Sequence, residues 1–170
     1  ESRIMDMYRE IDREHVQFDF VVHSKPDYYD AEILSLGGKI YRLPRFKIYN
    51  FFSYRKAWKQ FLKEHHEYAA IHGHMTSTAA IYLPLAKKAG IPITIAHARS
   101  AGVDRSLKGF VTRMIRKPLK NKADFLFTCS ELAGRAVYGD KVYDQGRVKL
   151  VPNAIGTQKF VYNPEVREKM

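Results

Sequence analysis

The amino-acid sequence predicts an α/β protein built on a Rossmann-like, doubly wound parallel sheet. Helical and strand patterns alternate along the 170-residue chain, as they do in folds where a crossover helix follows each strand. Several strand candidates, such as Ile93–His97 and Phe125–Thr128, are continuous apolar runs, which indicates strands covered on both faces. Apolar residues make up 45% of the chain and charged residues 28%, which is typical of a protein with a buried core.

Helices are predicted where apolar side chains recur every three or four residues. Gly37 and Gly90 end two of these segments, Ser130 is expected to cap another, and Pro118 is expected to disturb the end of a fourth. The predicted helices cover Ile4–Ile11, Asp30–Leu36, Phe51–Leu62, Thr76–Lys88, Leu107–Ile115 and Glu131–Tyr138, and a further one starts at Pro164.

Six strands are predicted between these helices. They cover Phe18–His23, Ile40–Leu43, Ala69–His72, Ile93–His97, Phe125–Thr128 and Val148–Val151. The chain opens in a helix, whereas the first strand of a doubly wound sheet usually lies mid-sheet. We therefore expect that first strand to be absent and the chain to be a fragment of a longer protein.

The charge of the chain is high and unevenly distributed. There are 29 basic and 18 acidic residues, for a net charge of +11. Two windows, Ile33–Lys63 and Arg105–Ala123, hold eight and seven cations respectively and no acid. Such concentration favours an anionic partner, either phosphate, nucleic acid or a lipid surface. No apolar run reaches the roughly 18 residues that a membrane span needs.

Polar residues follow most of the predicted strands. Because ligands of open α/β sheets bind at the carboxyl ends of the strands, these residues are the candidates for a site. They are His23-Ser24, His72-Gly73-His74, His97-Ala98-Arg99-Ser100, Cys129-Ser130-Glu131 and Pro152-Asn153-Ala154.

Standard catalytic and metal motifs are mostly absent from the sequence. It has no GxxxxGK[ST] phosphate loop and no GxSxG nucleophile turn. His72 and His74 share one face of a strand, but spacing places no third ligand beside them, so we expect no metal site. The single cysteine, Cys129, excludes an intrachain disulfide and is expected to be a small buried residue rather than a nucleophile.

Three segments together resemble a known family. Ala69–Ser100, Ala123–Gly139 and Val148–Phe160 are similar to the amino-terminal domain of glycosyltransferase family 4, in particular to EpsF-type enzymes of bacterial exopolysaccharide synthesis. The opening, Glu1–Asp12, resembles the segment that follows the first strand of those enzymes. The resemblance covers nearly the whole chain.

The resemblance implies one half of a GT-B enzyme, in which two Rossmann-like domains face each other across a cleft. Such enzymes transfer sugar from a nucleotide-sugar with retention of configuration, usually without metal. Residues 1–163 would be the acceptor-binding domain, and residues 164–170 would start the linker to a donor-binding domain that is missing here. This fragment would hold no cofactor and would be inactive alone, and the intact enzyme would use a UDP-sugar.

The resemblance also implies roles for individual residues. The position of His97 normally faces the transferred sugar, so His97 is the expected catalytic residue. Ser130 and Glu131 match the family's serine–glutamate pair, and Asn153 matches the asparagine of its "PNG" turn. The residues expected to line the acceptor site or cleft are His74, Arg99, Ser100, Ser130, Glu131 and Asn153. Two positions depart from the family pattern: Ala154 replaces a common glycine and Gly156 a usual aspartate.

The expected acceptor is a glycan or a polyprenyl-diphosphate-linked sugar, bound by an enzyme at the cytoplasmic, inner face of the plasma membrane. The helix within Arg105–Lys122 has the cationic, amphipathic profile of an interfacial helix. We expect its apolar residues, from Leu107 to Ile115, to pack on the sheet. The cations expected to face an anionic membrane are Lys108, Arg113, Arg116, Lys117 and Lys120.

Two other classes of function remain open from the sequence. The window Lys39–Lys63 interleaves cations with aromatic residues, which could bind single-stranded nucleic acid. Phe51, Tyr54, Trp58 and Phe61 in that window keep helical spacing, which favours core burial, so no nucleic acid is expected as a partner. A non-catalytic regulatory or solute-binding α/β domain is the third class.

Overall fold

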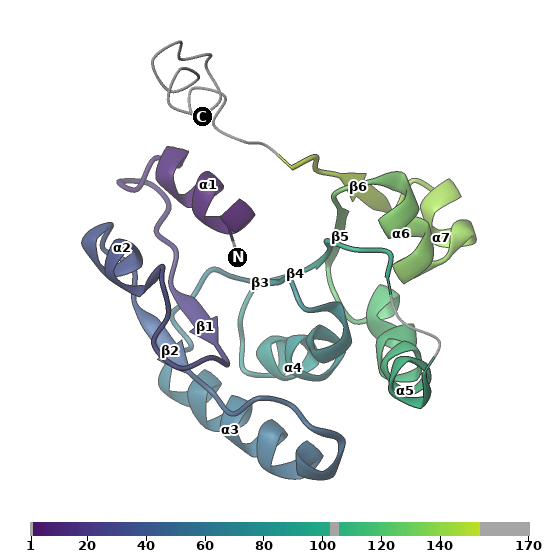
Figure 1. Ribbon diagram of the computed structural model, residues 1–170, viewed down its shortest axis with the longest axis horizontal. Helices are drawn as coiled ribbons and strands as arrows, with labels where there is room; N and C mark the ends of the chain where they lie inside the picture. Colours follow the sequence, from purple (N-terminus) through teal and green to yellow (C-terminus); the bar gives the residue numbers. More distant parts are fainter. Residues whose placement is uncertain (1, 103–105, 154–170) are drawn as a thin grey trace, which may run out of the picture. The chain divides into compact units, whose positions relative to one another are not determined.

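The computed structural model describes residues 2–102 and 106–153 and confirms a Rossmann-like α/β fold with parallel strands alternating with helices (Figure 1). The chain divides into two compact units. The described residues of the first unit are 2–41 and 153, and the second unit holds residues 42–152.

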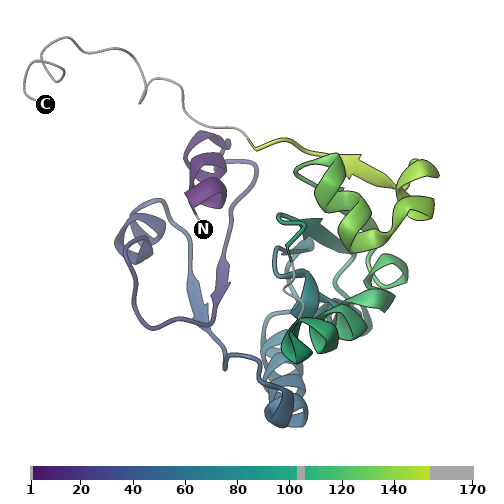
Figure 2. The ribbon, with the colours of Figure 1, turned by 45° about the vertical axis from the view of Figure 1, so that its right-hand side comes forward.

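The first unit contains two helices and a two-stranded sheet, which can be followed as the purple and blue ribbon of Figure 2. Its elements are α1 (Ser2–Glu10), β1 (Phe20–Val22), α2 (Asp30–Ser35) and β2 (Ile40–Arg42), the last of which runs to the unit boundary. Met5, Tyr8 and Ile33 form its buried core. The apolar face of α1 that the sequence predicts is therefore the face that is buried.

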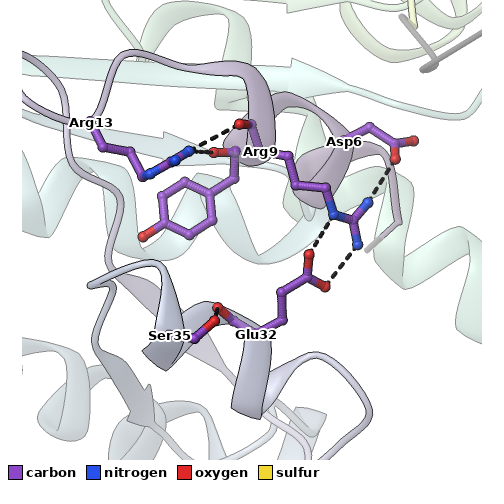
Figure 3. A network of polar contacts seen from close by, with 6 residues as sticks. Asp6, Arg9, Arg13, Glu32 and Ser35 are labelled. Carbon is purple, nitrogen blue, oxygen red and sulfur yellow. Dashed lines mark hydrogen bonds and ion pairs between the residues drawn. The ribbon is translucent and has the colours of Figure 1, made fainter. Parts of the chain in front are cut away.

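A polar network joins α1 to α2 on the surface of the first unit (Figure 3). The Arg9 guanidinium donates to both carboxylate oxygens of Glu32, at 2.5 and 2.7 Å, and to Asp6 at 2.9 Å. Bidentate arginine–carboxylate geometry is among the stronger polar contacts because both hydrogen bonds are charge-assisted. This contact fixes the rotation of the two helices about their shared apolar core.

The second unit is built on a four-stranded sheet in the order β3-β4-β5-β6. Its strands are β3 (Ala70–Gly73), β4 (Ile93–Ala98), β5 (Phe125–Thr128) and β6 (Val148–Leu150), and each neighbouring pair is parallel. Because right-handed crossovers between consecutive neighbours all wind the same way, the connecting helices are placed on one face of the sheet. The order of the strands thus decides which face stays free of those helices.

The second unit has five α-helices and two 3₁₀ helices in its described part. They are η1 (Ile48–Asn50), α3 (Phe51–Glu64), α4 (Thr76–Lys88), α5 (Leu107–Arg116), η2 (Lys117–Asn121), α6 (Glu131–Tyr138) and α7 (Asp140–Asp144). Figure 1 shows α4 between α3 and α5, both of which pack against it. The α4 bounds match the prediction, as do those of α6, where Ser130 Oγ accepts from the Ala133 N–H at 3.2 Å.

The sequence missed some short elements in this unit. Pro118 disturbs the end of the fifth predicted helix as expected, and the chain continues there as the 3₁₀ turn η2, which was not predicted. The five-residue α7 was not predicted either, because it buries only Val142 and directly follows Gly139, whose φ of +91° breaks the helical pattern. The helix predicted from Pro164 lies outside the described residues.

The aromatic stripe of α3 is buried, which bears on the nucleic-acid alternative. Tyr54, Trp58 and Phe61 are 0%, 3% and 6% exposed. The Trp58 ring stacks on Tyr82 of α4, with ring centroids 4.2 Å apart. These three rings hold α3 on α4 and are unavailable for stacking on bases.

Asp124, directly before β5, closes the amino-terminal edge of the sheet. Its Oδ2 accepts from both the backbone N–H (2.9 Å) and the hydroxyl (2.8 Å) of Thr94, which is fully buried. Lys87 forms an ion pair with the other carboxylate oxygen. The Lys87 and Thr94 hydrogen bonds lower the pKa of Asp124. The ionised Asp124 carboxylate therefore stabilises the fold at pH values above the pKa that Asp124 has in the unfolded chain. This stabilisation is lost as the pH falls through the lower pKa that Asp124 has in the folded protein.

We expect Asp124→Ala to lower the free energy of unfolding by about 1–3 kcal/mol, because two buried donors of Thr94 lose their acceptor. Chemical denaturation at pH 7 measures the effect. The matched control, Lys87→Met, removes only an exposed ion pair and should cost less than about 1 kcal/mol. Equal midpoints for Asp124→Ala and wild type would contradict this role for Asp124.

Candidate functional site

The carboxyl ends of β3, β4, β5 and β6 lie along one edge of the sheet, because all four strands are parallel. We call this the carboxyl edge. Three of the predicted polar groups meet it directly: His72 and His74 from β3, His97 and Arg99 from β4, and Ser130 after β5. The parallel order that the sequence predicts is therefore what gathers residues from separate segments.

His72, His74 and His97 form a cluster, which we call the histidine cluster. In the β3–β4 register His72 pairs with Ile95 and Gly73 with Ala96, so the next position along brings His74 beside His97. The rings of His72 and His97 are stacked with centroids 5.2 Å apart, and the His74 centroid lies 4.1 Å from His72 and 5.5 Å from His97. The three imidazoles are thus mutual neighbours on one face of the sheet.

The imidazoles of the histidine cluster are neutral at pH 7. Burial, followed by the nearby charge of Arg99, lowers the pKa of His72 to about 4. Burial, His72 and Arg99 likewise lower the pKa of His97 to about 4, and burial is also the main cause of the lowered pKa of His74. A neutral imidazole offers one N–H donor and one lone-pair acceptor without adding charge.

One hydrogen bond orders the histidine cluster. His72 Nε2 lies 3.1 Å from His97 Nδ1, so one of these nitrogens carries the proton and the other accepts it. When His97 Nδ1 is the donor, His97 Nε2 carries a bare lone pair. His97 Nε2 and His74 Nδ1 are both buried and have no hydrogen-bond partner among the described residues. Two ring nitrogens are therefore free to bind a ligand.

Gly73 lets helix α4 approach the strand that carries His72 and His74. A Cβ on Gly73 would lie 2.6 Å from the Tyr82 hydroxyl oxygen and 3.1 Å from the Ala79 Cβ. Successive side chains of a strand point to opposite faces, so Gly73 meets α4 while its two neighbours point away from it. The pattern His-Gly-His places both imidazoles on the face opposite the helix.

The other predicted site residues of β4 and β5 occupy more ordinary positions. Arg99 is half-buried and close enough to act electrostatically on all three histidines. Ser100 is exposed, and its Oγ accepts from the Gly102 N–H at 3.1 Å. Ser130 is occupied as the N-cap of α6, and Glu131 pairs with Arg135 at 2.8 Å. Asn153 is exposed and belongs to the first unit.

His72 is a strand-end candidate that was not among the residues expected to line the acceptor site or cleft. Spacing along the sequence placed no third ligand beside His72 and His74, whereas in the structure His97 completes a group whose ligand atoms lie within 4.8 Å of one another. Spacing along one strand could not reveal this, since 25 residues separate His72 from His97. The detectable signal was the parallel register, which sets β3 against β4.

Helix α5 differs from the expected membrane-facing helix in two respects. Arg116 is only 7% exposed and its guanidinium donates to the Ala136 carbonyl at 3.0 Å, so the expectation that it faces outward is wrong. α5 packs against α4 rather than against the sheet, and Leu107, Phe110 and Met114 are 81%, 54% and 55% exposed. The expected burial of the apolar face is therefore wrong for these three residues.

The remaining cations of this region border an apolar groove. Arg113 and Lys117 are exposed and Lys120 is half-buried, whereas the side chain of Lys108 lies outside the described part of the chain. A groove of about 340 Å³ runs between α5–η2 and the end of α6, with Met114 and Val137 in its lining. Within residues 2–102 and 106–153, no helix is long and apolar enough to cross a membrane.

The carboxyl edge of this α/β unit thus carries a cluster of three imidazoles with Arg99 nearby. The sequence profile of glycosyltransferase family 4 matches residues 1–159, and the chain belongs to this family. It is also 28% identical over 173 residues to "Putative glycosyltransferase EpsF" of Bacillus subtilis (strain 168). That alignment covers 99% of this chain and 45% of the relative, so the chain spans about half the length of the relative.

Membership confirms the resemblance. Enzymes of family 4 typically use nucleotide-sugar donors, and their reaction requires a sugar donor and an acceptor.

We expect Gly73→Ala to lower the free energy of unfolding by about 1–3 kcal/mol, because the added methyl forces Tyr82 away from its stack on Trp58. Thermal denaturation measures the loss. Removing the clashing hydroxyl in the double variant Gly73→Ala/Tyr82→Phe should restore part of the stability relative to the sum of the single changes. Strictly additive effects would show that this contact does not limit the approach of α4.

Proposed function

We propose that this chain is the acceptor-binding part of a retaining glycosyltransferase. The enzyme would transfer a sugar from a nucleotide-sugar to a glycan or a polyprenyl-diphosphate-linked acceptor in exopolysaccharide or capsular polysaccharide synthesis. The observation that carries the proposal is the buried, neutral histidine cluster beside Arg99 at the carboxyl edge. Membership of family 4 and the similarity to EpsF support the class of reaction.

The chemistry of sugar transfer suits this cluster. The bond between the anomeric carbon and the donor phosphate oxygen breaks, and the nucleotide diphosphate leaves with the electron pair. The acceptor hydroxyl oxygen bonds to the anomeric carbon, and its proton passes to an oxygen of the leaving diphosphate. Neutral imidazoles can orient sugar hydroxyls as donors and acceptors without opposing the positive charge that develops on the sugar ring. The free nitrogens of His97 and His74 are the proposed contacts.

Arg99 is proposed to meet the negative charge of the substrates. A guanidinium matches phosphate oxygens through two parallel hydrogen bonds. Its guanidinium is a cation close enough to act on all three imidazoles of the histidine cluster. The nucleotide itself is proposed to bind a further domain, because the chain covers only 45% of its relative.

In the full-length enzyme, His97→Ala should lower kcat/KM for sugar transfer by at least about 100-fold, because a preorganised polar contact to the reacting sugar is lost. The measurement is product formation with a nucleotide-sugar donor, together with circular dichroism to verify folding. His66→Ala, which removes an exposed imidazole at the end of α3, is the matched control. Wild-type rates for His97→Ala would exclude His97 from the site.

The face formed by α5 and η2 is proposed to bind an anionic membrane surface, where a lipid-linked acceptor would be found. Exposed Leu107, Phe110 and Met114 can insert among lipid chains while Arg113, Lys117 and Lys120 meet the headgroups. Arg116 takes no part because its guanidinium is buried against Ala136. The proposed location is therefore the cytoplasmic face of the plasma membrane, with the enzyme as a peripheral protein.

Reversing Arg113, Lys117 and Lys120 to Glu should weaken binding to phosphatidylserine-containing vesicles by at least about 100-fold, since each cation near such a surface contributes about 1 kcal/mol. Co-sedimentation at low salt measures binding. The matched control reverses Lys56, Lys59 and Lys63, three exposed cations of α3. An equal loss of vesicle binding in both triple variants would show that only the net charge matters. That result would contradict a specific membrane-binding face at α5 and η2.

A further inference from the structure

We propose that His72, His74 and His97 also bind a divalent transition-metal ion, with Zn²⁺ as the expected ion. The inference goes beyond sugar transfer and does not depend on it. It reverses the expectation drawn from spacing alone, which lacked the third ligand. One ring nitrogen from each residue contributes to a group lying within 4.8 Å.

The geometry of the histidine cluster suits a tetrahedral ion. Zinc–nitrogen bonds of about 2.0–2.1 Å at tetrahedral angles place ligand nitrogens roughly 3.3 Å apart. His72 Nε2 and His97 Nδ1 already lie 3.1 Å apart. His74 lies two residues beyond His72 on the same face of the sheet, so a small rotation of its side chain can bring its ring nitrogen to the ion as the third ligand. The backbone of two hydrogen-bonded strands holds all three positions.

The hydrogen bonding of the cluster is compatible with metal binding. A histidine binds a metal through the lone pair of a neutral ring. His74 Nδ1 makes no hydrogen bond to any described residue, so an ion that bound it would break none. Only the hydrogen bond between His72 Nε2 and His97 Nδ1 would be exchanged for metal–nitrogen bonds.

The ligand set selects the class of metal. Three imidazoles without a carboxylate or thiolate suit Zn²⁺, Co²⁺, Ni²⁺ or Cu²⁺, and they do not suit Mg²⁺ or Ca²⁺, which prefer oxygen. Three protein ligands leave the fourth tetrahedral position open to water or an anion. Because a bound ion would occupy the ring nitrogen of His74 that is also a proposed sugar contact, metal binding and that hydrogen bond are mutually exclusive.

The positive charge of Arg99 should weaken metal binding, and removing that charge therefore tests the proposed site. Its positive charge acts on all three imidazoles, as their pKa values record, and it repels a divalent cation for the same reason. Replacing it with Met keeps an unbranched side chain of similar length and removes the charge. A genuine site at this cluster should therefore bind metal more tightly in Arg99→Met, whereas a surface histidine elsewhere should be unaffected.

The experiment is a titration of the 170-residue chain with ZnCl₂ against a chelating indicator, with CoCl₂ as a spectroscopic probe. We expect one ion per chain and the intense visible absorption of tetrahedral Co²⁺. His74→Gln should weaken zinc binding by at least about tenfold, and Arg99→Met should tighten it by at least about threefold. The control His65→Gln/His66→Gln removes the neighbouring pair after α3 and should bind like wild type.

Two results would overturn the proposal. One is unchanged zinc affinity in His74→Gln, and the other is loss of the stoichiometric site in His65→Gln/His66→Gln. A measurement on the wild-type protein tests the proposal even if a variant fails to fold. In a titration with Co²⁺, the NMR signals of His72, His74 and His97 should shift or broaden at lower metal concentrations than those of His65 and His66. Equal effects on all five imidazoles would also refute the site.

Discussion

The parallel register of β3 and β4 is the constraint on which the site depends. It sets His74, which follows one strand, beside His97 of the next, although 22 residues of chain lie between them. The same parallel order turns every crossover in one direction, so α4 and α6 pack on the sheet face that carries Gly73, and the Tyr138 hydroxyl of α6 reaches the Ala96 carbonyl at 2.8 Å. The opposite face is left to the histidines and to Phe127, whose ring meets His72 and His97 edge-on.

Close packing on one face is what makes chemistry possible on the other. Thr94, Ala96 and Ala98 are fully buried beneath the helices, so β4 cannot rotate without opening that core. His97 is thereby held with its Nδ1 toward His72, and a site whose groups are fixed by a packed core loses little entropy when a ligand binds. Gly73 and Asp124 also help to fix β4. Gly73 lets α4 pack closely on the sheet, and Asp124 binds the side chain of Thr94.

Much of this arrangement could be predicted from the sequence because it follows from local signals. The periodicity of α4, the Ser130 cap and the apolar runs of the strands all report on their own segments, and each appears as expected. Features that depend on tertiary packing could not be predicted in this way. Arg116 resembles its neighbouring cations in sequence, yet its guanidinium donates to the carbonyl of Ala136 in α6, and α5 packs on α4 instead of the sheet.

The electrostatics of the carboxyl edge connect its proposed uses. Burial disfavours charge on the three imidazoles, whereas the guanidinium of Arg99 beside them is a cation, so a ligand here would meet neutral ring nitrogens and a positive charge. The proposed sugar phosphate suits both, because its hydroxyls can contact the rings and its phosphate can contact the guanidinium. The proposed metal ion suits only the rings, and it must overcome the charge of Arg99 unless an anion takes its open coordination position. We therefore expect the charge of Arg99 to favour the substrate over the metal.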